Sequence, residues 1–379
     1  MDYKLSSEHL MARTLFSEFA ENEVKPYAVE IDETEEFPRG TVDKLQKYGF
    51  MGIPIPREFG GQGCDTLTYV MCVEEISKRC ATTGVIISAH TSLCCDPIWK
   101  YGTPAQKDEF LKPLASGDKL GAFALTEPGA GTDAAGVQTK AVLEGEEYVL
   151  NGSKIFITNG KEADIYIIFA LTDPSKGTKG MSAFIVEKGT PGFTFGTKEK
   201  KMGIRGSSTY ELIFRDCRIP RENLLGAEGK GFSIAMGTLD GGRIGIAAQA
   251  LGIAEGALEA TVAYVKQRKQ FGRAIAQFQN TQFTLADLAT KVEAAKQLVY
   301  KAAYAKDTQK RFSVEAAMAK LFAAETAMEV TTKCVQLHGG YGYTREYAVE
   351  RMMRDAKITE IYEGTSEVQR MVISGSLLN

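Results

Sequence analysis

A glutamate beside a glycine near the C-terminus is the first candidate for chemistry. Glu363 stands between Tyr362 and Gly364 in the segment ITEIYEGTSEV, residues 358–368. An ordinary glutamate, with a reference pKa of about 4.3, is a feeble base toward a C–H bond. Burial beside apolar groups raises the carboxyl pKa toward neutrality, and this favours proton abstraction. A helix-capping role is the alternative for Glu363, although Glu367 fits that role better.

A glycine-rich segment follows a predicted strand in the middle of the chain. The strand GAFALT runs into EPGAGTDAAG, residues 127–136, whose backbone can approach a flat or anionic ligand closely. Gly129 and Gly131 lack the third glycine of a dinucleotide fingerprint, and the flanking elements are strands. Further on, KIFITNG offers Phe156 to pack on a ring and Thr158 to hydrogen-bond to a ring nitrogen. An ordinary strand connection is the alternative for the loop taken alone.

Two later segments join helix ends to groups that suit phosphate. QRKQFGR carries Arg268 beside Phe271, and arginine can hold phosphate oxygens bidentately. A solvated helix end that complements the helix dipole is the alternative. QLHGGYGY places Gly339 and Gly340 where they serve equally as a helix C-cap or as room for a ligand, and spacing leaves both open. His338 in this segment is interpreted as a packed or capping side chain.

Composition excludes several classes of function. The 45 Lys and Arg residues against 48 Asp and Glu residues give a net charge of −3, so we expect no nucleic acid and no membrane surface as a partner. Three histidines are too few and too scattered for a metal site, and none is predicted. Seven cysteines without CxxC spacing indicate reduced thiols and a cytoplasmic protein. The N-terminal residues lack the pattern of a signal peptide.

The elements that must position these groups fall into three stretches. Up to about residue 120, apolar residues recur at three- and four-residue intervals, which indicates helices. Between 121 and 228 the period changes to two, which indicates a β domain with a hairpin turn at Asn151-Gly152. Long alanine-rich helices then return and predict a four-helix bundle. The predicted domains are therefore 1–120, 121–228 and 229–379, and the fold class is mainly α with a middle β domain.

Four motifs, taken in order, resemble those of the acyl-CoA dehydrogenase family. They are LTEPGAGTDAAG, FITNG, RKQFG, and QLHGGYGY followed by MRDAKITEIYEGTSEVQR. The resemblance covers essentially the whole chain and is strongest to short-chain, butyryl-CoA dehydrogenases of anaerobic bacteria. It implies a homotetramer of three-domain subunits. Each subunit would have an N-terminal α-helical domain, a middle β domain of barrel-like or sandwich type, and a C-terminal four-helix bundle.

The resemblance also implies FAD as the cofactor. The first two motifs would contact the flavin, with Thr158 near N5, and many relatives carry Trp where this chain has Phe156. RKQFG would meet the pyrophosphate and adenosine portion, and the segment from Gln336 to Gly340 would reach that same portion from a neighbouring subunit. The implied cofactor-binding residues are Phe123, Leu125, Thr126, Gly131, Thr132, Phe156, Ile157, Thr158, Arg268, Gln270, Phe271, Gln279, Gln336, Gly339, Gly340, Thr365 and Glu367.

For the substrate, the resemblance implies a CoA-contacting segment at the start of a long helix and an acyl pocket between the N-terminal helices and the bundle. In some relatives the catalytic base lies in that helix, but Gly242 fills the place here, which favours Glu363 as the base. Residues 87–99 are further candidates to set the depth of the pocket. The implied substrate-binding residues are Thr132, Leu239, Asp240, Arg243, Tyr362 and Gly364.

The expected reaction is α,β-dehydrogenation of a short-chain acyl-CoA, from butyryl-CoA to crotonyl-CoA or the reverse. Glu363 would remove the α-proton, its backbone N–H would donate to the thioester oxygen, and FAD N5 would take the β-hydride. Electrons would be exchanged with an electron-transferring flavoprotein. The alternatives are a dehydrogenase or oxidase for branched or other acyl-CoA substrates, and a non-enzymatic helical scaffold, which would be colourless when purified.

Overall fold

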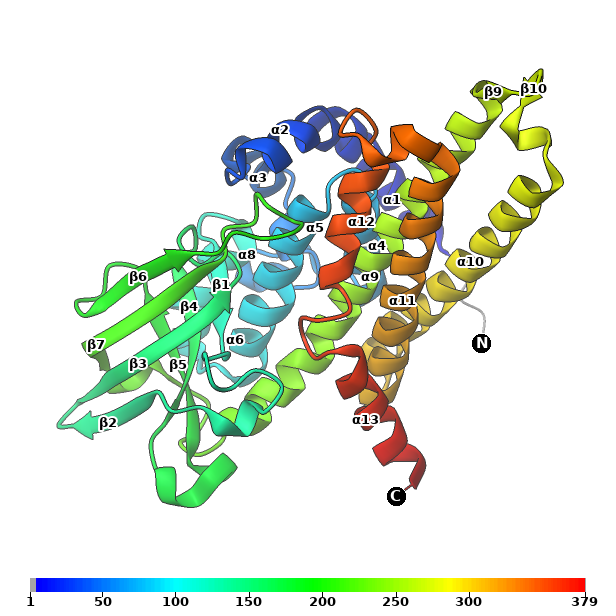
Figure 1. Ribbon diagram of the computed structural model, residues 1–379. Coiled ribbons are helices and arrows are strands. Elements are labelled where there is room, and N and C mark those ends of the chain that lie inside the picture. The colour runs from blue at the N-terminus through cyan, green and yellow to red at the C-terminus, as the bar shows by residue number, and fades with distance from the viewer. Residues whose placement is uncertain (1–4, 379) are drawn as a thin grey trace.

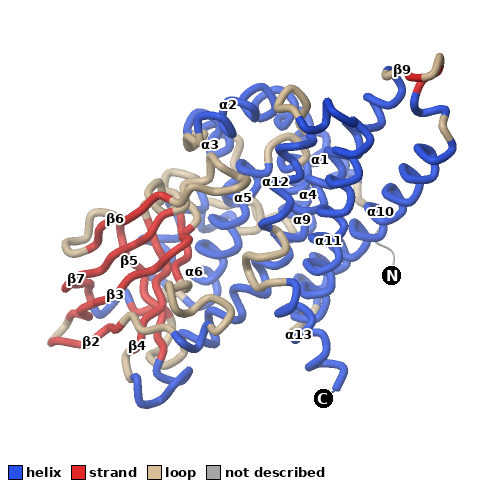
Figure 2. Tube along the Cα trace, viewed as in Figure 1, coloured by secondary structure: helices blue, strands red, loops and turns tan. Residues whose placement is uncertain are grey.

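The computed structural model describes residues 5–378. Residues 1–4 and 379, which the predicted outer domains include, lie outside the described residues. A β-sheet occupies one end of the molecule, the long C-terminal helices occupy the other, and some of the N-terminal helices lie between them (Figures 1 and 2). The predicted fold class is confirmed. The predicted domain limits stay a prediction, because a change from helix to strand does not by itself delimit a folding unit.

The N-terminal helices begin where side chains satisfy free backbone N–H groups. The Ser6 hydroxyl accepts from the N–H of His9 at 3.2 Å, and the His9 ring accepts from the N–H of Ser6 at 3.3 Å, which completes a capping box. Asp65 caps the fourth helix by accepting from the N–H of Thr68. These helices are α1 (Ser7–Phe19), α2 (Ala28–Thr34), α3 (Arg39–Lys47), α4 (Thr66–Ser77), α5 (Ala81–Ser88), α6 (Asp96–Tyr101), α7 (Pro104–Gln106) and α8 (Lys112–Ser116).

The middle of the chain folds into one mixed sheet, which has eight strands within the described residues. Its order is β6-β7-β3-β2-β4-β5-β8, and β1 pairs in parallel with β4. The glycine-rich segment leads from β1 to β2, and both strands pair with β4, at Gly121↔Ile165 and Lys140↔Leu171. The strands are β1 (Gly121–Ala124), β2 (Lys140–Glu144), β3 (Glu147–Ile157), β4 (Ile165–Leu171), β5 (Met181–Glu187), β6 (Phe193–Lys198), β7 (Tyr210–Pro220) and β8 (Leu224–Leu225).

The predicted hairpin turn at Asn151-Gly152 is wrong. The turn between β2 and β3 lies between Glu144 and Glu147, whereas Asn151-Gly152 lies inside β3. There the register against β7 shifts. The Asn151 side-chain amide donates to the Asp216 carboxylate at 3.1 Å, and the Asn151 side-chain oxygen accepts from the backbone N–H of Asp216 at 2.9 Å. The extra residue of this β-bulge lies on β7, where Asp216 has a left-handed φ of 48°. Glycine is required at position 152 because a Cβ there would lie 2.6 Å from the Thr139 hydroxyl oxygen.

The C-terminal part is built from long helices joined by short connections. They are α9 (Gly231–Gln267), α10 (Gln279–Thr308), α11 (Ser313–His338), α12 (Val349–Ile358) and α13 (Ser366–Leu378), and a small hairpin of β9 (Lys269–Gln270) and β10 (Arg273–Ala274) separates the first two. Alanine and glycine fill more than half of the buried positions of α9, and alanine fills half of those of α11. Small side chains let these helices approach one another closely.

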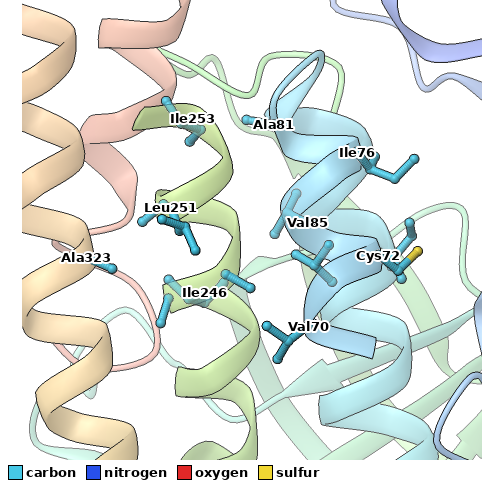
Figure 3. Packing of buried hydrophobic residues seen from close by; sticks show 14 of the residues in the cluster. Val70, Cys72, Ile76, Ala81, Val85, Ile246, Leu251, Ile253 and Ala323 are labelled. Carbon is cyan, nitrogen blue, oxygen red and sulfur yellow. The ribbon is translucent and has the colours of Figure 1, made fainter. Parts of the chain in front are cut away.

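The hydrophobic core includes residues from more than one of the three predicted domains. One buried cluster joins Val70 and Ile76 of α4 with Leu251 of α9 and Ala323 of α11 (Figure 3). Strand β4 alternates between two other clusters: Ile167 packs toward the helices, and Ile168 packs on the opposite face of the sheet. The N-terminal and C-terminal helices therefore share a core, and the sheet is packed on both faces. No helix within the described residues is long and apolar enough to cross a membrane.

Candidate active site

The turn between α12 and α13 has a strained backbone. After α12 ends at Ile358, Glu363 adopts a φ of 55° and Gly364 a φ of 94°. A left-handed conformation costs a residue with a Cβ roughly 1–2 kcal/mol, while glycine adopts it freely. Such strain persists only where the surroundings impose it, and it is concentrated at functional sites.

This turn directs the Glu363 side chain toward the middle of α9. A Cβ added to Gly242 would lie 2.0 Å from Oε2 of Glu363 and 2.6 Å from Cδ2 of Leu93. Glu363 is half-buried as a residue, but its Oε2 is covered by protein and has no hydrogen-bond partner among the described residues. A buried carboxyl oxygen without a partner is unusual, because such a group normally finds a donor. It is available to a ligand.

Burial and two cations set the acidity of this carboxyl group. Burial raises the pKa of Glu363 to about 8, against the opposing pull of the positive charges on Lys320 and Arg243. Burial likewise lowers the pKa of Lys320 to about 8, although Glu363 acts in the other direction. A carboxyl group with a pKa near neutrality can accept and return a proton at physiological pH, as a general base must.

Glu363 does not cap the following helix. At the start of α13 the hydroxyl of Thr365 accepts from the N–H of Val368 at 3.4 Å. Glu367 is exposed in the first turn of that helix, where a negative charge complements the helix dipole. The capping alternative for Glu363 is therefore wrong in this structure, and Glu367 does lie where the helical role requires it.

Five of the six implied substrate residues lie on α9 and on the turn itself, and the sixth, Thr132, lies in the glycine-rich loop. Asp240 forms an ion pair with Arg243 at 2.5 Å and accepts a hydrogen bond from Ser313 at the start of α11. Leu239 packs against a cluster that includes residues of α6 and the sheet. On the turn, Tyr362 donates its hydroxyl proton to the side chain of Gln249 in α9. The structure thus brings Leu239, Asp240, Arg243, Tyr362 and Gly364 around one stretch of α9.

The wall opposite Glu363 comes from the N-terminal helices. Leu93 belongs to a buried π-helical turn, Ala89–Cys95, and turns of this type are frequent at functional sites. One helical turn beyond Gly242, a Cβ on Gly245 would lie 2.3 Å from the Ser88 hydroxyl oxygen and 2.6 Å from the Tyr69 hydroxyl oxygen. Glycines on α9 therefore let residues of the predicted pocket segment 87–99 approach the helix.

The two segments expected to contact the flavin lie side by side. The N–H of Ile155 donates to the carbonyl of Thr126 at 2.9 Å, which joins the end of β1 to β3. Phe123 lies near this junction and packs on Phe169, while Leu125 is buried. In β3, Ile157 points inward, but Phe156 is 59% exposed with a φ of 60°, and Thr158 is half-buried.

A buried ion pair anchors the glycine-rich loop. Lys154 donates to Glu127 at 2.7 Å and to the carbonyl of Leu125 at 3.0 Å, and Glu127 accepts from the N–H groups of Gln138 and Thr139. Within the loop Gly131 and Thr132 are exposed, and a Cβ on Gly131 would meet nothing within 4 Å. The ends of the loop are fixed, and its middle is open to a ligand.

The remaining predicted cofactor residues lie at the other end of α9. Arg268 follows that helix about 26 residues beyond Gly242, which corresponds to roughly 39 Å at 1.5 Å per residue. Phe271 is 93% exposed on the β9–β10 hairpin, far from the sheet in Figure 1. The exposed residues at this end also include Gln270, Gln279, Gln336, Gly339 and Gly340.

These distal segments lie together in one chain. The Arg268 guanidinium lies 5.2 Å from the ring centre of Tyr341, and the Tyr264 hydroxyl donates to the carbonyl of His338 at 3.2 Å. The His338 ring stacks on Tyr264, which agrees with its structural interpretation. Within one copy of the chain the two segments therefore lie side by side. Their expected division between neighbouring subunits stays a prediction.

Sequence reasoning missed three buried polar residues that shape the site. Lys320 and Gln369 both donate to the carbonyl of Gly364, at 2.7 Å and 2.8 Å, and Gln249 accepts from Tyr362. All three are fully buried. A signal existed for Lys320, since it interrupts the apolar face of an alanine-rich helix. No local pattern connects Gln249 or Gln369 to Glu363.

Comparison with known proteins assigns the chain to a class. Family models for the N-terminal, middle and C-terminal domains of acyl-CoA dehydrogenases match residues 6–118, 122–217 and 229–378. The chain belongs to the acyl-CoA dehydrogenase family, a family of oxidoreductases. It is 62% identical over 377 residues to the short-chain specific acyl-CoA dehydrogenase of Clostridium acetobutylicum, with 100% of each chain covered. The expected resemblance to short-chain members is confirmed.

Solved structures agree with this assignment. Butyryl-CoA dehydrogenase from Megasphaera elsdenii is 54% identical with a TM-score of 0.99, and 100% of each chain is covered. A chain in the structure reported for the electron transferring flavoprotein of Acidaminococcus fermentans is 57% identical, also with a TM-score of 0.99 and 100% of each chain covered. The FAD complex of PigA is 31% identical with a TM-score of 0.95, covering 100% of this chain and 99% of the other.

Proposed function

We propose that this protein is an FAD-dependent dehydrogenase for short-chain acyl-CoA thioesters, with Glu363 as the catalytic base. The observation that carries the proposal is the Glu363 carboxyl group, which lies opposite Gly242 with an unpartnered oxygen and a pKa raised to about 8. Butyryl-CoA is the favoured substrate because the chain is similar to short-chain specific relatives and to a butyryl-CoA dehydrogenase.

In the dehydrogenating direction, Glu363 takes the proton from Cα of the thioester. The electron pair of that C–H bond forms the new double bond as a hydride leaves Cβ. Bound FAD supplies the acceptor for that hydride. The N–H of Glu363 makes no hydrogen bond to a described residue, so it is free to donate to the thioester oxygen as negative charge develops there. The proton and the hydride together account for both hydrogens removed.

The residues present fit FAD as the cofactor. Exposed Phe156 and the open loop around Gly131 offer a surface for a flat ring system. At the distal end of α9, Arg268 offers a guanidinium to a pyrophosphate. Because roughly 39 Å of helix separates that end from Gly242, one dinucleotide would have to draw on two copies of the chain. This supports an oligomer, and a homotetramer is the expected form.

An electron-transferring flavoprotein is the proposed redox partner. The support is the similarity to a chain in a structure reported for such a flavoprotein, at 57% identity over the whole length. The reduced cofactor must return its two electrons to an acceptor before a second turnover, and an electron-transferring flavoprotein would supply that acceptor. The same pair of proteins would serve the reverse reaction, from crotonyl-CoA to butyryl-CoA. A cytoplasmic location remains part of the proposal.

The test is anaerobic titration of the purified flavoprotein with acyl-CoA, followed by the visible absorbance of the flavin. We expect butyryl-CoA to bleach the flavin more readily than isobutyryl-CoA or octanoyl-CoA. The Glu363→Gln variant should retain FAD but resist reduction, whereas Glu360→Gln, which changes a carboxylate on the same turn that pairs with Lys357, should behave as the wild type. Normal bleaching of Glu363→Gln would show that the base has been misassigned, and a colourless protein that takes up no FAD would favour the scaffold alternative.

A further inference from the structure

Lys320 occupies a position where a lysine is costly. It lies in the middle of α11 and is fully buried, and the buried residues around it on the same helix are alanines: Ala316, Ala317, Ala319, Ala323, Ala324 and Ala327. Lysine is almost never fully buried unless its charge is compensated. Alanine or methionine would satisfy the packing of this helix without that penalty. The presence of an ammonium group here therefore calls for a specific partner.

That partner is the backbone of the turn that carries Glu363. The Lys320 ammonium donates to the carbonyl oxygen of Gly364 at 2.7 Å. Gln369 of α13 donates to the same oxygen at 2.8 Å and to the carbonyl of Glu363 at 3.3 Å. Two buried side chains on two helices thus fix the two carbonyl groups of the strained residues. Fixing them also fixes the direction in which the Glu363 side chain leaves the backbone.

The charge of Lys320 acts on the same carboxyl group. Charged and titratable groups face Glu363 and Lys320 from each neighbouring element: Arg243 of α9, Glu360 of the turn, Glu367 of α13 and, toward Glu363, Tyr69 of α4. Arg243 is already paired with Asp240 at 2.5 Å, so part of its positive charge is offset nearby. Among the described residues, the hydrogen bond that Lys320 makes is to the Gly364 carbonyl, and no carboxylate lies within ion-pair distance of its ammonium group. Its charge is the less compensated of the two.

We propose that Lys320 is a positioning residue for the catalytic base: its ammonium group holds the Gly364 carbonyl so that the Glu363 carboxyl stays opposite Gly242, and its positive charge favours the carboxylate form. This inference rests on the proposed role of Glu363. A lysine that acted only through packing would leave the acidity of Glu363 unchanged. In the proposed role, the pKa of Glu363 depends on the positive charge at position 320. The position of the Glu363 carboxyl group depends on a hydrogen-bond donor at the same position.

Three substitutions separate these contributions. Lys320→Arg keeps the charge, Lys320→Gln keeps a neutral donor, and Lys320→Met removes both. Lys333→Met is the matched control, because Lys333 is an exposed lysine on the same helix. If Lys320→Met fails to fold, the Gln and Arg variants still carry the comparison, because each retains a polar group for the Gly364 carbonyl.

The first measurement is the pH profile of kcat/KM of the FAD-loaded enzyme with butyryl-CoA. Removing a nearby positive charge raises the pKa of a carboxyl group, so the rising limb of the profile should move to higher pH in Lys320→Gln and Lys320→Met. A shift of about one pH unit corresponds to about a tenfold lower kcat/KM on the acid side of the limb. Lys320→Arg should restore most of the wild-type profile. The Lys333→Met profile should match the wild type.

The second measurement does not need turnover. Infrared difference titration of the holoenzyme against its Glu363→Gln variant reads the protonated carboxyl group of Glu363 directly. We expect its midpoint to rise in Lys320→Gln in step with the kinetic limb. An unchanged midpoint, or a loss of activity that is equal at every pH, would reduce Lys320 to a packing residue and overturn the inference. Because this titration works even if butyryl-CoA fails to reduce the flavin, failure of the proposed function is distinguishable from failure of the role of Lys320.

Discussion

Replacing Gly242 by alanine tests whether the space opposite Glu363 is required for chemistry. The substitution adds one methyl group in the interior of α9. That methyl group would lie 2.0 Å from Oε2 of Glu363 and 2.6 Å from Cδ2 of Leu93, whereas ordinary van der Waals contact begins near 3.4 Å. Both neighbours are the far ends of flexible side chains. The backbone therefore need not move, and the carboxyl group has to retreat.

The size of the effect follows from that retreat. The Glu363 carboxyl must move by roughly 1–1.5 Å, and a displacement of about 1 Å at a reacting group costs on the order of 100-fold in rate. This corresponds to about 2.7 kcal/mol of activation free energy. Folding stability should not fall in parallel, because replacing glycine by alanine inside a helix gains up to about 1 kcal/mol. Activity and stability should thus separate.

The assay is the rate constant of flavin reduction by butyryl-CoA in anaerobic stopped flow, together with urea unfolding of the same sample. Gly40→Ala is the control for the helix effect, because a Cβ at this position in α3 would meet nothing within 4 Å. We expect wild-type reduction in Gly40→Ala and about 100-fold slower reduction in Gly242→Ala. Wild-type reduction in Gly242→Ala would refute the placement of the base against α9.

Three further predictions concern acidity, the loop anchor and the distal end. Burial raises the pKa of Glu363 from its ordinary value near 4.5 to about 8. The stability that the protonated Glu363 carboxyl contributes is therefore fully present below about pH 4.5 and is lost as the pH rises through 8. In urea unfolding, the stability of Glu363→Gln relative to the wild type should increase between these two pH values and stay constant above about pH 8. Lys154→Met leaves the buried Glu127 carboxylate without its ion-pair partner and should lower the free energy of unfolding by about 3–5 kcal/mol. The control Lys140→Met changes an exposed lysine and should lower it by under about 1 kcal/mol. Equal losses in the two variants would contradict the role of the Lys154–Glu127 pair in anchoring the loop. Phe271→Ala removes a side chain that is 93% exposed. The variant should retain less FAD after gel filtration, and the unfolding midpoint of its apoprotein should match that of the wild type. Full retention of FAD would argue against a cofactor contact at the β9–β10 hairpin.

The fold class was predictable because periodicity reports burial directly. Strand β4 sends Ile167 and Ile168 into different clusters, and the unbroken apolar run in DIYIIFALT already indicates a strand that is buried on both faces. The hairpin prediction failed because Asn-Gly also suits the strand opposite a β-bulge, and the local sequence does not distinguish a turn from that position. The choice between them depends on the partner strand.

The candidate site was predictable only as far as motifs reach. Glu363 was found from its own turn, and Gly242 from a comparison of two positions for the base. Lys320 was missed because its partner, Gly364, lies 44 residues away on a different element. The grouping of Arg268 with the segment after α11 was missed for the same reason: which parts of a chain meet at one end of a helix is decided by tertiary packing.

The core shared by the first and last helices has a consequence during synthesis. Helices α4 and α5 leave the ribosome well before α9, against which they pack, and α5 ends at Ser88 while α9 begins at Gly231. Roughly 140 residues must be translated in between, which takes on the order of 7–30 seconds at ordinary rates. During that interval Val70 and Val85 lack the part of their cover that α9 supplies. The nascent chain should therefore depend on chaperones that shield its N-terminal third, and a fragment ending after the sheet should aggregate rather than fold.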